Sequence, residues 1–215
     1  LWGFRSRQEL EAAGAVHLAH SPAALAALLG VWLDGAQAAL SDRVIRLHVL
    51  ANSDSEADQA LKLRVRDAVL AEAEELFVPG AGRAETEELL RAHLYDLAAA
   101  GAEVVGEAGY SYPVTASLVH DYWFPPKTYT DFALPAGAYT ALRIEIGAGG
   151  GQNWWCVVFP PLCLGSVSET TQETALEAGL TENQVSLMTG EDEGYVVKFK
   201  AVELLEQFKG WLEGR

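Results

Sequence analysis

The spacing of apolar residues changes along this chain, and that change is what most constrains its fold. Between residues 56 and 100 apolar residues recur every three or four positions, which is the period of an amphipathic helix. From residue 110 to 159 they recur mostly at every second position, which is the period of a strand with one buried face. Helical and strand segments grouped in this way, instead of alternating regularly, predict an α+β fold.

The boundaries of the elements follow from the same pattern. A strand is expected at 43–51, helices from about 53 to 78 and from 85 to 100, and strands at 110–122, 139–146 and 153–159. The first helix should begin at a capping box formed by Ser53 and Glu56. The glycine-rich run 147–151 should join the last two of these strands as a β-hairpin. A strand at 195–201 and a helix at 204–212 complete a largely antiparallel sheet of four to five strands with two helices after the first strand and a C-terminal helix.

The chain has 215 residues, near the upper limit for one domain. We expect an N-terminal segment over 1–40 and one α+β domain over 41–215. Residues 164–194 are acidic and rich in small polar residues, with one weakly helical patch at 173–178, and are interpreted as a mobile insertion.

The charge balance excludes one class of partner. Thirty acidic and fifteen basic residues give a formal net charge of −15, a field that repels phosphate backbones, so nucleic acid is not expected as a partner. The acids concentrate at 53–103 and 164–194, which are either solvated surfaces or a docking patch for a basic partner.

The N-terminal segment has the order of a signal peptide. Arg5 and Arg7 precede an eleven-residue apolar run at 23–33, and a small-x-small triplet follows at 36–38. This run is too short to span a bilayer as a helix. The alternative is an amphipathic helix with Leu25, Leu28 and Trp32 on one face.

Two motifs that could hold a ligand are better explained by structure. The glycine run lies between two strand patterns, whereas a phosphate-binding loop opens a helix. Asp54, Glu56 and Asp58 have the spacing of a calcium loop, but Gln59 and Val65 stand where that loop needs glycine and glutamate. We therefore expect no cofactor and no metal.

Two cysteines, Cys156 and Cys163, are either buried thiols or one disulfide. With His48 and His120 they could form a Cys-His nucleophile pair, although His120 is expected in the core beside Leu118. Trp154 and Trp155 must point to opposite faces of their strand, so one of them could anchor a protein or a sugar. A carbohydrate-binding module and a thiol hydrolase therefore stay open as alternatives.

Several stretches of the sequence resemble the stage II sporulation protein R family. They are R-L-H-V-L-A-N-S-D-S-E-A-D-Q-A-L-K-L-R-V-R-D at 46–67, G-A-Y-T-A-L-R-I-E-I-G at 137–147, N-W-W-C-V-V-F-P-P-L-C at 153–163 and V-K-F-K-A-V-E at 197–203. The resemblance implies a signalling protein that is made in the forespore of an endospore-forming bacterium. It would be exported into the intermembrane space facing the mother cell, with only peripheral contact with the membrane.

There the family is needed to activate a membrane-embedded aspartic protease that cleaves the precursor of the sporulation factor sigma-E. The resemblance implies a non-enzymatic activator, and no catalytic residue is carried over. Export would favour a disulfide between Cys156 and Cys163. The candidates for the partner-facing surface are the motif residues Asn52, Ser53, Asp54, Gln59, Lys62, Arg66, Asp67, Asn153, Trp154 and Trp155.

Overall fold

The computed structural model of this chain describes residues 40–78, 80–129, 132–162 and 171–189. The chain divides into two compact units, residues 1–39 and 40–215, and all the described residues belong to the second. The predicted export segment therefore lies outside the described residues, except for Leu40. The predicted strand at 195–201 and the closing helix at 204–212 also lie outside them.

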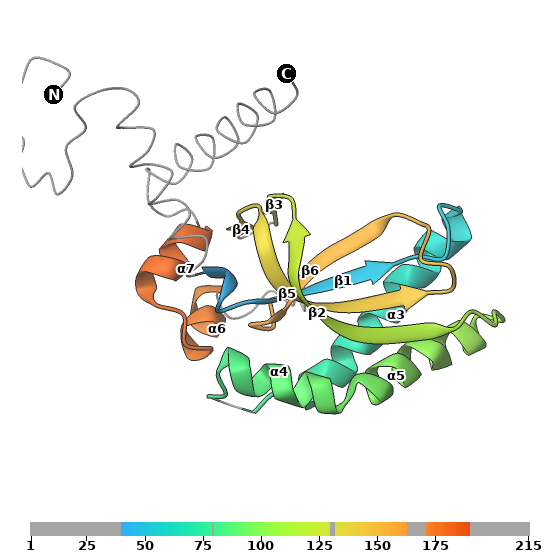
Figure 1. The fold of residues 1–215 in the computed structure, drawn as a ribbon, viewed down its shortest axis with the longest axis horizontal. Helices are drawn as coiled ribbons and strands as arrows, with labels where there is room; N and C mark the ends of the chain where they lie inside the picture. The colour runs from blue at the N-terminus through green and yellow to red at the C-terminus, as the bar shows by residue number, and fades with distance from the viewer. Residues whose placement is uncertain (1–39, 79, 130–131, 163–170, 190–215) are drawn as a thin grey trace, which may run out of the picture. The chain divides into compact units, whose positions relative to one another are not determined.

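The second unit begins with a strand, then helices, then further strands, as the sequence predicts (Figure 1). Four strands form the main sheet: β1 (Ile45–Leu50), β2 (Val114–Phe124), β5 (Gly137–Ile146) and β6 (Asn153–Phe159). The short strands β3 (Lys127–Thr128) and β4 (Ala133–Leu134) pair separately. The helices are α3 (Glu56–Glu75), α4 (Arg83–Ala92), α5 (Leu94–Glu107), α6 (Thr171–Glu177) and α7 (Glu182–Thr189).

The main sheet has the order β2-β5-β1-β6. The prediction of an α+β fold is confirmed, but the sheet is mixed because β1 and β5 are parallel. The predicted hairpin between β5 and β6 is wrong, since β1 lies between them and pairs antiparallel with β6. All six residues of β1 are buried, which is what a central strand requires.

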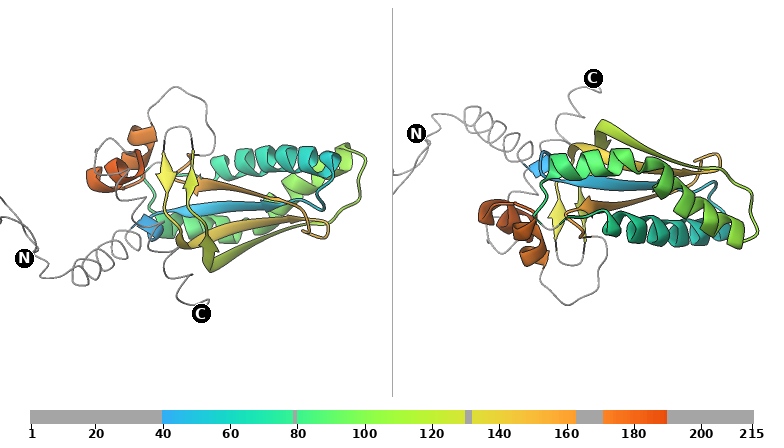
Figure 2. Two further views of the ribbon diagram at one scale, coloured as in Figure 1. Left: turned by 90° about the horizontal axis from the view of Figure 1, so that it is seen from above. Right: turned by 90° about the horizontal axis from the view of Figure 1, so that it is seen from below.

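Helices α3 and α5 cover one face of the sheet. Their buried residues, among them Leu61, Val65 and Leu97, pack with Leu47 and Ile144 of the strands in one apolar cluster. In the view from below, α4 and α5 run across the strands on this side (Figure 2). Burial of such side chains contributes roughly 1.5–3 kcal/mol each.

The other face is covered in part by the β3–β4 hairpin and by α6 and α7. Phe124, Leu134 and Tyr139 form a second apolar cluster there with residues of both helices, namely Ala175, Val185 and Met188. The mobile insertion predicted for 164–194 is therefore wrong for residues 171–189, because these form helices with buried side chains. The segment between the strands predicted at 110–122 and 139–146 contains the small β3–β4 hairpin.

The predicted helix at 85–100 differs in two ways. It is broken at His93, whose backbone is not helical, so α4 and α5 are separate helices. It also continues past Gly101, where it was expected to stop. A Cβ at Gly101 would lie 3.0 Å from Val114 and 3.1 Å from Val65, so this glycine permits close packing of α5 between α3 and β2.

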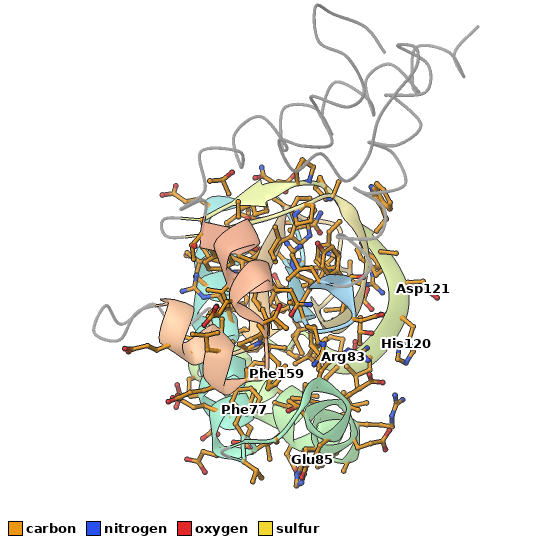
Figure 3. The ribbon with its side chains drawn as sticks, turned by 90° about the vertical axis from the view of Figure 1, so that its left-hand side faces the viewer. Phe77, Arg83, Glu85, His120, Asp121 and Phe159 are labelled. Atoms are coloured by element: carbon orange, nitrogen blue, oxygen red, sulfur yellow. The ribbon has the colours of Figure 1, made fainter. Side chains whose placement is uncertain are left out.

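The prediction that His120 lies in the core is wrong, because a β-bulge interrupts β2 at this position. The register of β2 shifts between Val119 and Tyr122, and Asp121 in the bulge has φ of +53°. Beyond the bulge the alternation is reversed, so Tyr122 packs on the second face. The His120 side chain is 52% exposed and lies near Arg83, with both side chains contacting Thr140 (Figure 3).

Candidate functional site

Two turns meet at the carboxyl ends of the parallel strands β1 and β5. Residues 51–55 connect β1 to α3, and residues 147–152 connect β5 to β6; we call them the turn pair. The amides of Gly151 and Gly150 donate to the carbonyl oxygens of Ala51 (2.9 Å) and Asn52 (3.2 Å). The Ala148 amide donates to Asn52 Oδ1 (3.0 Å). The Gln152 amide donates to Asp54 Oδ1 (2.7 Å), so each turn holds the other in place.

The turns approach so closely that one position must be glycine. A Cβ built at Gly151 would lie 2.2 Å from the carbonyl oxygen of Ser53 and 3.0 Å from Ala51 Cβ. Backbone cannot move aside as a flexible side chain can. The glycine-rich run is therefore a docking segment that passes over the end of β1, and this explains why β5 and β6 are not neighbours.

A buried carboxylate organises the first turn. Asp58 accepts hydrogen bonds from Ser53 Oγ (2.5 Å) and Asn52 Nδ2 (2.9 Å) and is 4% exposed. The bond from Ser53, followed by the bond from Asn52, lowers the pKa of Asp58. The carboxylate is thus held in its charged, accepting form, which fixes both side chains of the turn.

Lys62 ties the helix to the second turn. Its Nζ donates to Gln59 Oε1 (2.6 Å) and to the carbonyl oxygen of Gln152 (2.9 Å), and the residue is only 4% exposed. Gln59 Nε2 in turn donates to the carbonyl oxygen of Ser53 (2.9 Å). Burial lowers the pKa of Lys62, because the charged ammonium is poorly solvated there.

Arg66 and Trp154 form a neighbouring stack. The Arg66 guanidinium carbon lies 4.4 Å from the centre of the Trp154 ring, and its Nη2 lies 2.6 Å from Asp67 Oδ1. Trp154 is half-buried and packs against the cluster under α3 and α5. A cation over an indole face is a rigid arrangement at the surface.

Asn153 and Trp155 lie on the other face of the sheet. Asn153 is exposed, and its Oδ1 lies 2.8 Å from His48 Nε2. The Trp155 ring packs against His48 and Phe124 in the second cluster. Trp154 and Trp155 therefore point to opposite faces, as predicted.

The predicted partner-facing residues thus have different environments. The residues from Asn52 to Asp67, together with Trp154, gather around the turn pair, whereas Trp155 does not join them. Asp54, Asp67 and Asn153 are exposed, Lys62 is buried, and the others are half-buried. Most of the polar candidates hold the turns together. Their contact with a partner stays a prediction, and Asp54 is the exposed carboxylate that the turn pair itself presents.

Sequence reasoning missed the buried cation of β1. Arg46 is completely buried, with its guanidinium 4.3 Å from the centre of the Phe124 ring and 5.1 Å from that of Tyr139. Its Nε donates to the carbonyl oxygen of Cys156 and its Nη2 to Tyr129 Oη, both at 3.2 Å. Burial raises the pKa of both tyrosines. Arg46 therefore ties the β3–β4 hairpin to the sheet.

The geometry separates Cys156 from the histidines. Cys156 belongs to the cluster under the helices, while His48 lies on the opposite face of the sheet. Cys156 is disulfide-bonded in the structure. Cys163 lies outside the described residues, so its pairing with Cys156 stays a prediction.

In the described part of the chain, no three histidine, cysteine or acidic side chains are grouped so that they could hold a metal ion. Asp54 and Asp58, two of the acids with calcium-loop spacing, instead accept hydrogen bonds within the turn pair. None of the helices over the same described residues has the length and hydrophobicity needed to cross a membrane.

Comparison with known proteins gives a family match that includes the main sheet and both turns. Residues 41–169 match the family model for stage II sporulation protein R. Stage II sporulation protein R of Bacillus subtilis (strain 168) is 39% identical over 124 residues, which are 58% of this chain and 55% of that protein. The chain thus matches about half the length of this relative. No solved structure matches the chain.

Proposed function

Because this chain belongs to the stage II sporulation protein R family, a sporulation family, we propose that it is the signal that activates a membrane-embedded aspartic protease. The activated protease would cleave the sigma-E precursor in the mother cell. The chain would act by protein contact alone, without transforming a substrate. The observation that supports this proposal best is the turn pair, a surface preformed by hydrogen bonds between two distant segments.

A preformed surface suits an activator for a physical reason. A ligand shifts its receptor toward activity only by binding the active state more tightly than the inactive state. A surface that is already ordered loses little conformational entropy on binding. More of the free energy of the contacts can therefore favour the active state of the receptor over the inactive state. Asp54 and Asn153 are exposed at this end of the sheet and could make such contacts.

We also propose that the chain works outside the cytoplasm, in the space between forespore and mother cell. The order of residues 5–38, with basic residues before an apolar run and a small-x-small triplet, supports export. The disulfide-bonded state of Cys156 is of the kind expected in an oxidising compartment.

The contact surface is tested by Asp54→Asn, which removes a charge but keeps an oxygen that can accept from the Gln152 amide. In membranes containing the protease and the precursor, we expect this variant to lower the rate of precursor cleavage about tenfold, the scale of one lost charged hydrogen bond. Glu85→Gln is the matched control, because Glu85 is exposed on α4 (Figure 3). If the two variants activate equally well while folded, Asp54 is not part of the contact.

A carbohydrate-binding module is the second candidate function. The structure exposes Trp123 by 58% and Tyr95 by 83%, and exposed aromatic rings can serve as platforms for sugars. Retention of the chain on purified peptidoglycan, and its loss in Trp123→Ala, would favour this function over the first.

A further inference from the structure

The sheet ends at an edge strand that the described part of the chain leaves unpaired on one side. β2 is the first strand of the order β2-β5-β1-β6 and pairs with β5 alone. Among its eleven residues only Phe124 is buried, whereas four of the seven residues of β6, at the opposite edge, are buried. Among the described residues, β2 is therefore the more exposed of the two edge strands.

The first six residues of β2 lack the usual protection of an edge. Val114 to Val119 pair with β5 in an unbroken register, from Val114 opposite Ile146 to Val119 opposite Ala141. This segment reads V-T-A-S-L-V and contains no charged residue and no proline. Proteins commonly protect edge strands with lysine, proline, bulges or covering elements. Here the bulge comes only after Val119, so the alternate residues of 114–119 that do not bond to β5 offer their amide and carbonyl groups outward along a regular edge.

We propose that this edge, residues 114–119, binds an extended basic segment of a partner protein by β-strand addition. The inference rests on the proposed function, for which it names a second contact surface. Backbone hydrogen bonds would supply the affinity, and side chains opposite Thr115 and Ser117 would supply the selectivity.

Charge decides between the occupants of this edge. The chain has a net charge of −15, so a second copy would bring two strongly negative molecules together. A strand with lysine or arginine beside β-branched residues is attracted by the same field, and its backbone complements the edge. A basic segment is therefore the occupant that fits, and we assign it to another protein; protection of the amides of 114–119 in the chain alone, by the strand predicted at 195–201, would contradict this choice.

A pair of peptides tests this directly, without the protease. The probes are the capped hexapeptides Lys-Val-Thr-Val-Lys-Val and Glu-Val-Thr-Val-Glu-Val, added to the folded chain and followed by amide hydrogen exchange. The basic peptide is expected to slow the exchange of amides in 114–119, with an affinity at least tenfold above that of the acidic peptide. Absence of protection at millimolar peptide, protection elsewhere, or equal binding of both peptides would overturn the proposal.

Opposite charges at one position give a matched pair of variants. Ser117 is half-exposed, so Ser117→Lys and Ser117→Glu should both fold. Ser117→Lys is expected to weaken binding of the basic peptide by about tenfold or more relative to Ser117→Glu. Ser111→Lys adds the same charge outside the strand and should bind like the unchanged chain. If all three variants bind alike, the contact is not at this edge.

Two further measurements separate this inference from its alternatives. Sedimentation of the chain alone should show a monomer, and a dimer that protects residues 114–119 would contradict the choice of occupant. In the precursor-cleavage assay, Ser117→Lys should activate less than Ser117→Glu. If the chain activates but these two variants do so equally, the edge proposal fails and the proposed function stands. If the chain does not activate the protease while the basic peptide still binds, the proposed function fails and the edge proposal stands.

Discussion

Gly151 lies where the connection from β5 to β6 crosses the end of β1. The carbonyl oxygen of Ser53 occupies the space that a side chain at this position would need, only 2.2 Å from the point where its Cβ would lie. Gly150, its neighbour in the same turn, would place a Cβ 3.5 Å from the Asn52 carbonyl oxygen, which is an ordinary contact. Two adjacent glycines in one run thus have different structural roles.

This difference gives the first prediction at the residue scale. Gly151→Ala should lower the free energy of unfolding by about 1–3 kcal/mol, because the two turns must separate to make room. Gly150→Ala is the matched control and should change it much less. Urea unfolding of the two variants measures this difference. Equal stability would show that the turns are not in close contact in solution.

His48 gives the second prediction. Burial is the main cause that lowers its pKa, and the positive charge of Arg143 adds to it, while the bond with Asn153 and the charge of Glu145 act in the opposite direction. The unfolded chain binds a proton at His48 near pH 6.5, whereas the folded protein binds it only at lower pH. The contribution of neutral His48 to stability is therefore complete above about pH 6.5 and is lost as the pH falls below that value.

The free energy of unfolding should consequently decrease between pH 7.5 and 5.5, and His48→Gln should reduce this decrease. His120→Gln, at an exposed position, serves as the control. Urea unfolding at several pH values gives the slopes. A slope that His48→Gln leaves unchanged would mean that other groups cause the pH dependence.

Arg46 shows what the sequence could not predict at this scale. A polar residue at every second position of a strand normally indicates a solvated face, and Arg46 and His48 follow that pattern. In the structure the same face is covered by Phe124, Tyr139 and Trp155, which belong to strands far from β1 in the sequence. Burial of a cation depends on which aromatic rings the fold brings over it, and local spacing does not contain that information.

At the scale of elements, α3 depends on its first turn. Ser55 has an extended backbone and its Oγ accepts from the Asp58 amide (3.2 Å), so Ser55 is the N-cap. The predicted capping box with Ser53 is therefore wrong by two residues, because the Ser53 hydroxyl donates to the Asp58 carboxylate instead. Both serines act in the same turn with different partners.

Ser55→Ala should lower the free energy of unfolding by about 1 kcal/mol, the usual contribution of an N-cap. Ser111→Ala, at an exposed position outside the helices, should change it by a few tenths at most. Thermal or urea unfolding of both variants provides the comparison. A loss of equal size in both would argue against Ser55 as the cap.

The elements of the sheet were predictable, but their neighbours were not. Strands β1, β5 and β6 lie within one or two residues of the segments predicted from alternation. The hairpin was wrong because two strands joined by a short glycine-rich run normally pair with each other. Here the run spans the width of β1, as the strand order and the close approach of Gly151 to Ser53 show. The bulge at Asp121 reversed the face of Tyr122 for a similar reason, since one extra residue is invisible to a periodic pattern.

On the scale of the whole molecule, the sequence predicted the α+β class and the family, and the site only in part. The motif residues at 52–67 and 153–154 gather near the turn pair, which supports their interpretation as one site. Their chemistry, however, is mostly internal: Lys62 and Asp58 are buried and bond within the turn pair. The surface left for a partner is therefore smaller than the motif, with Asp54 and Asn153 as its exposed polar groups and the β2 edge as a separate contact.

The central claim is that this chain activates another protein by contact. The rate of precursor cleavage, measured against the concentration of purified chain in membranes with and without the protease, tests it most directly. We expect a saturable increase in rate when the protease is present and no cleavage in its absence. Cleavage of the precursor by the chain alone, or an unchanged rate when the protease is present, would contradict the claim.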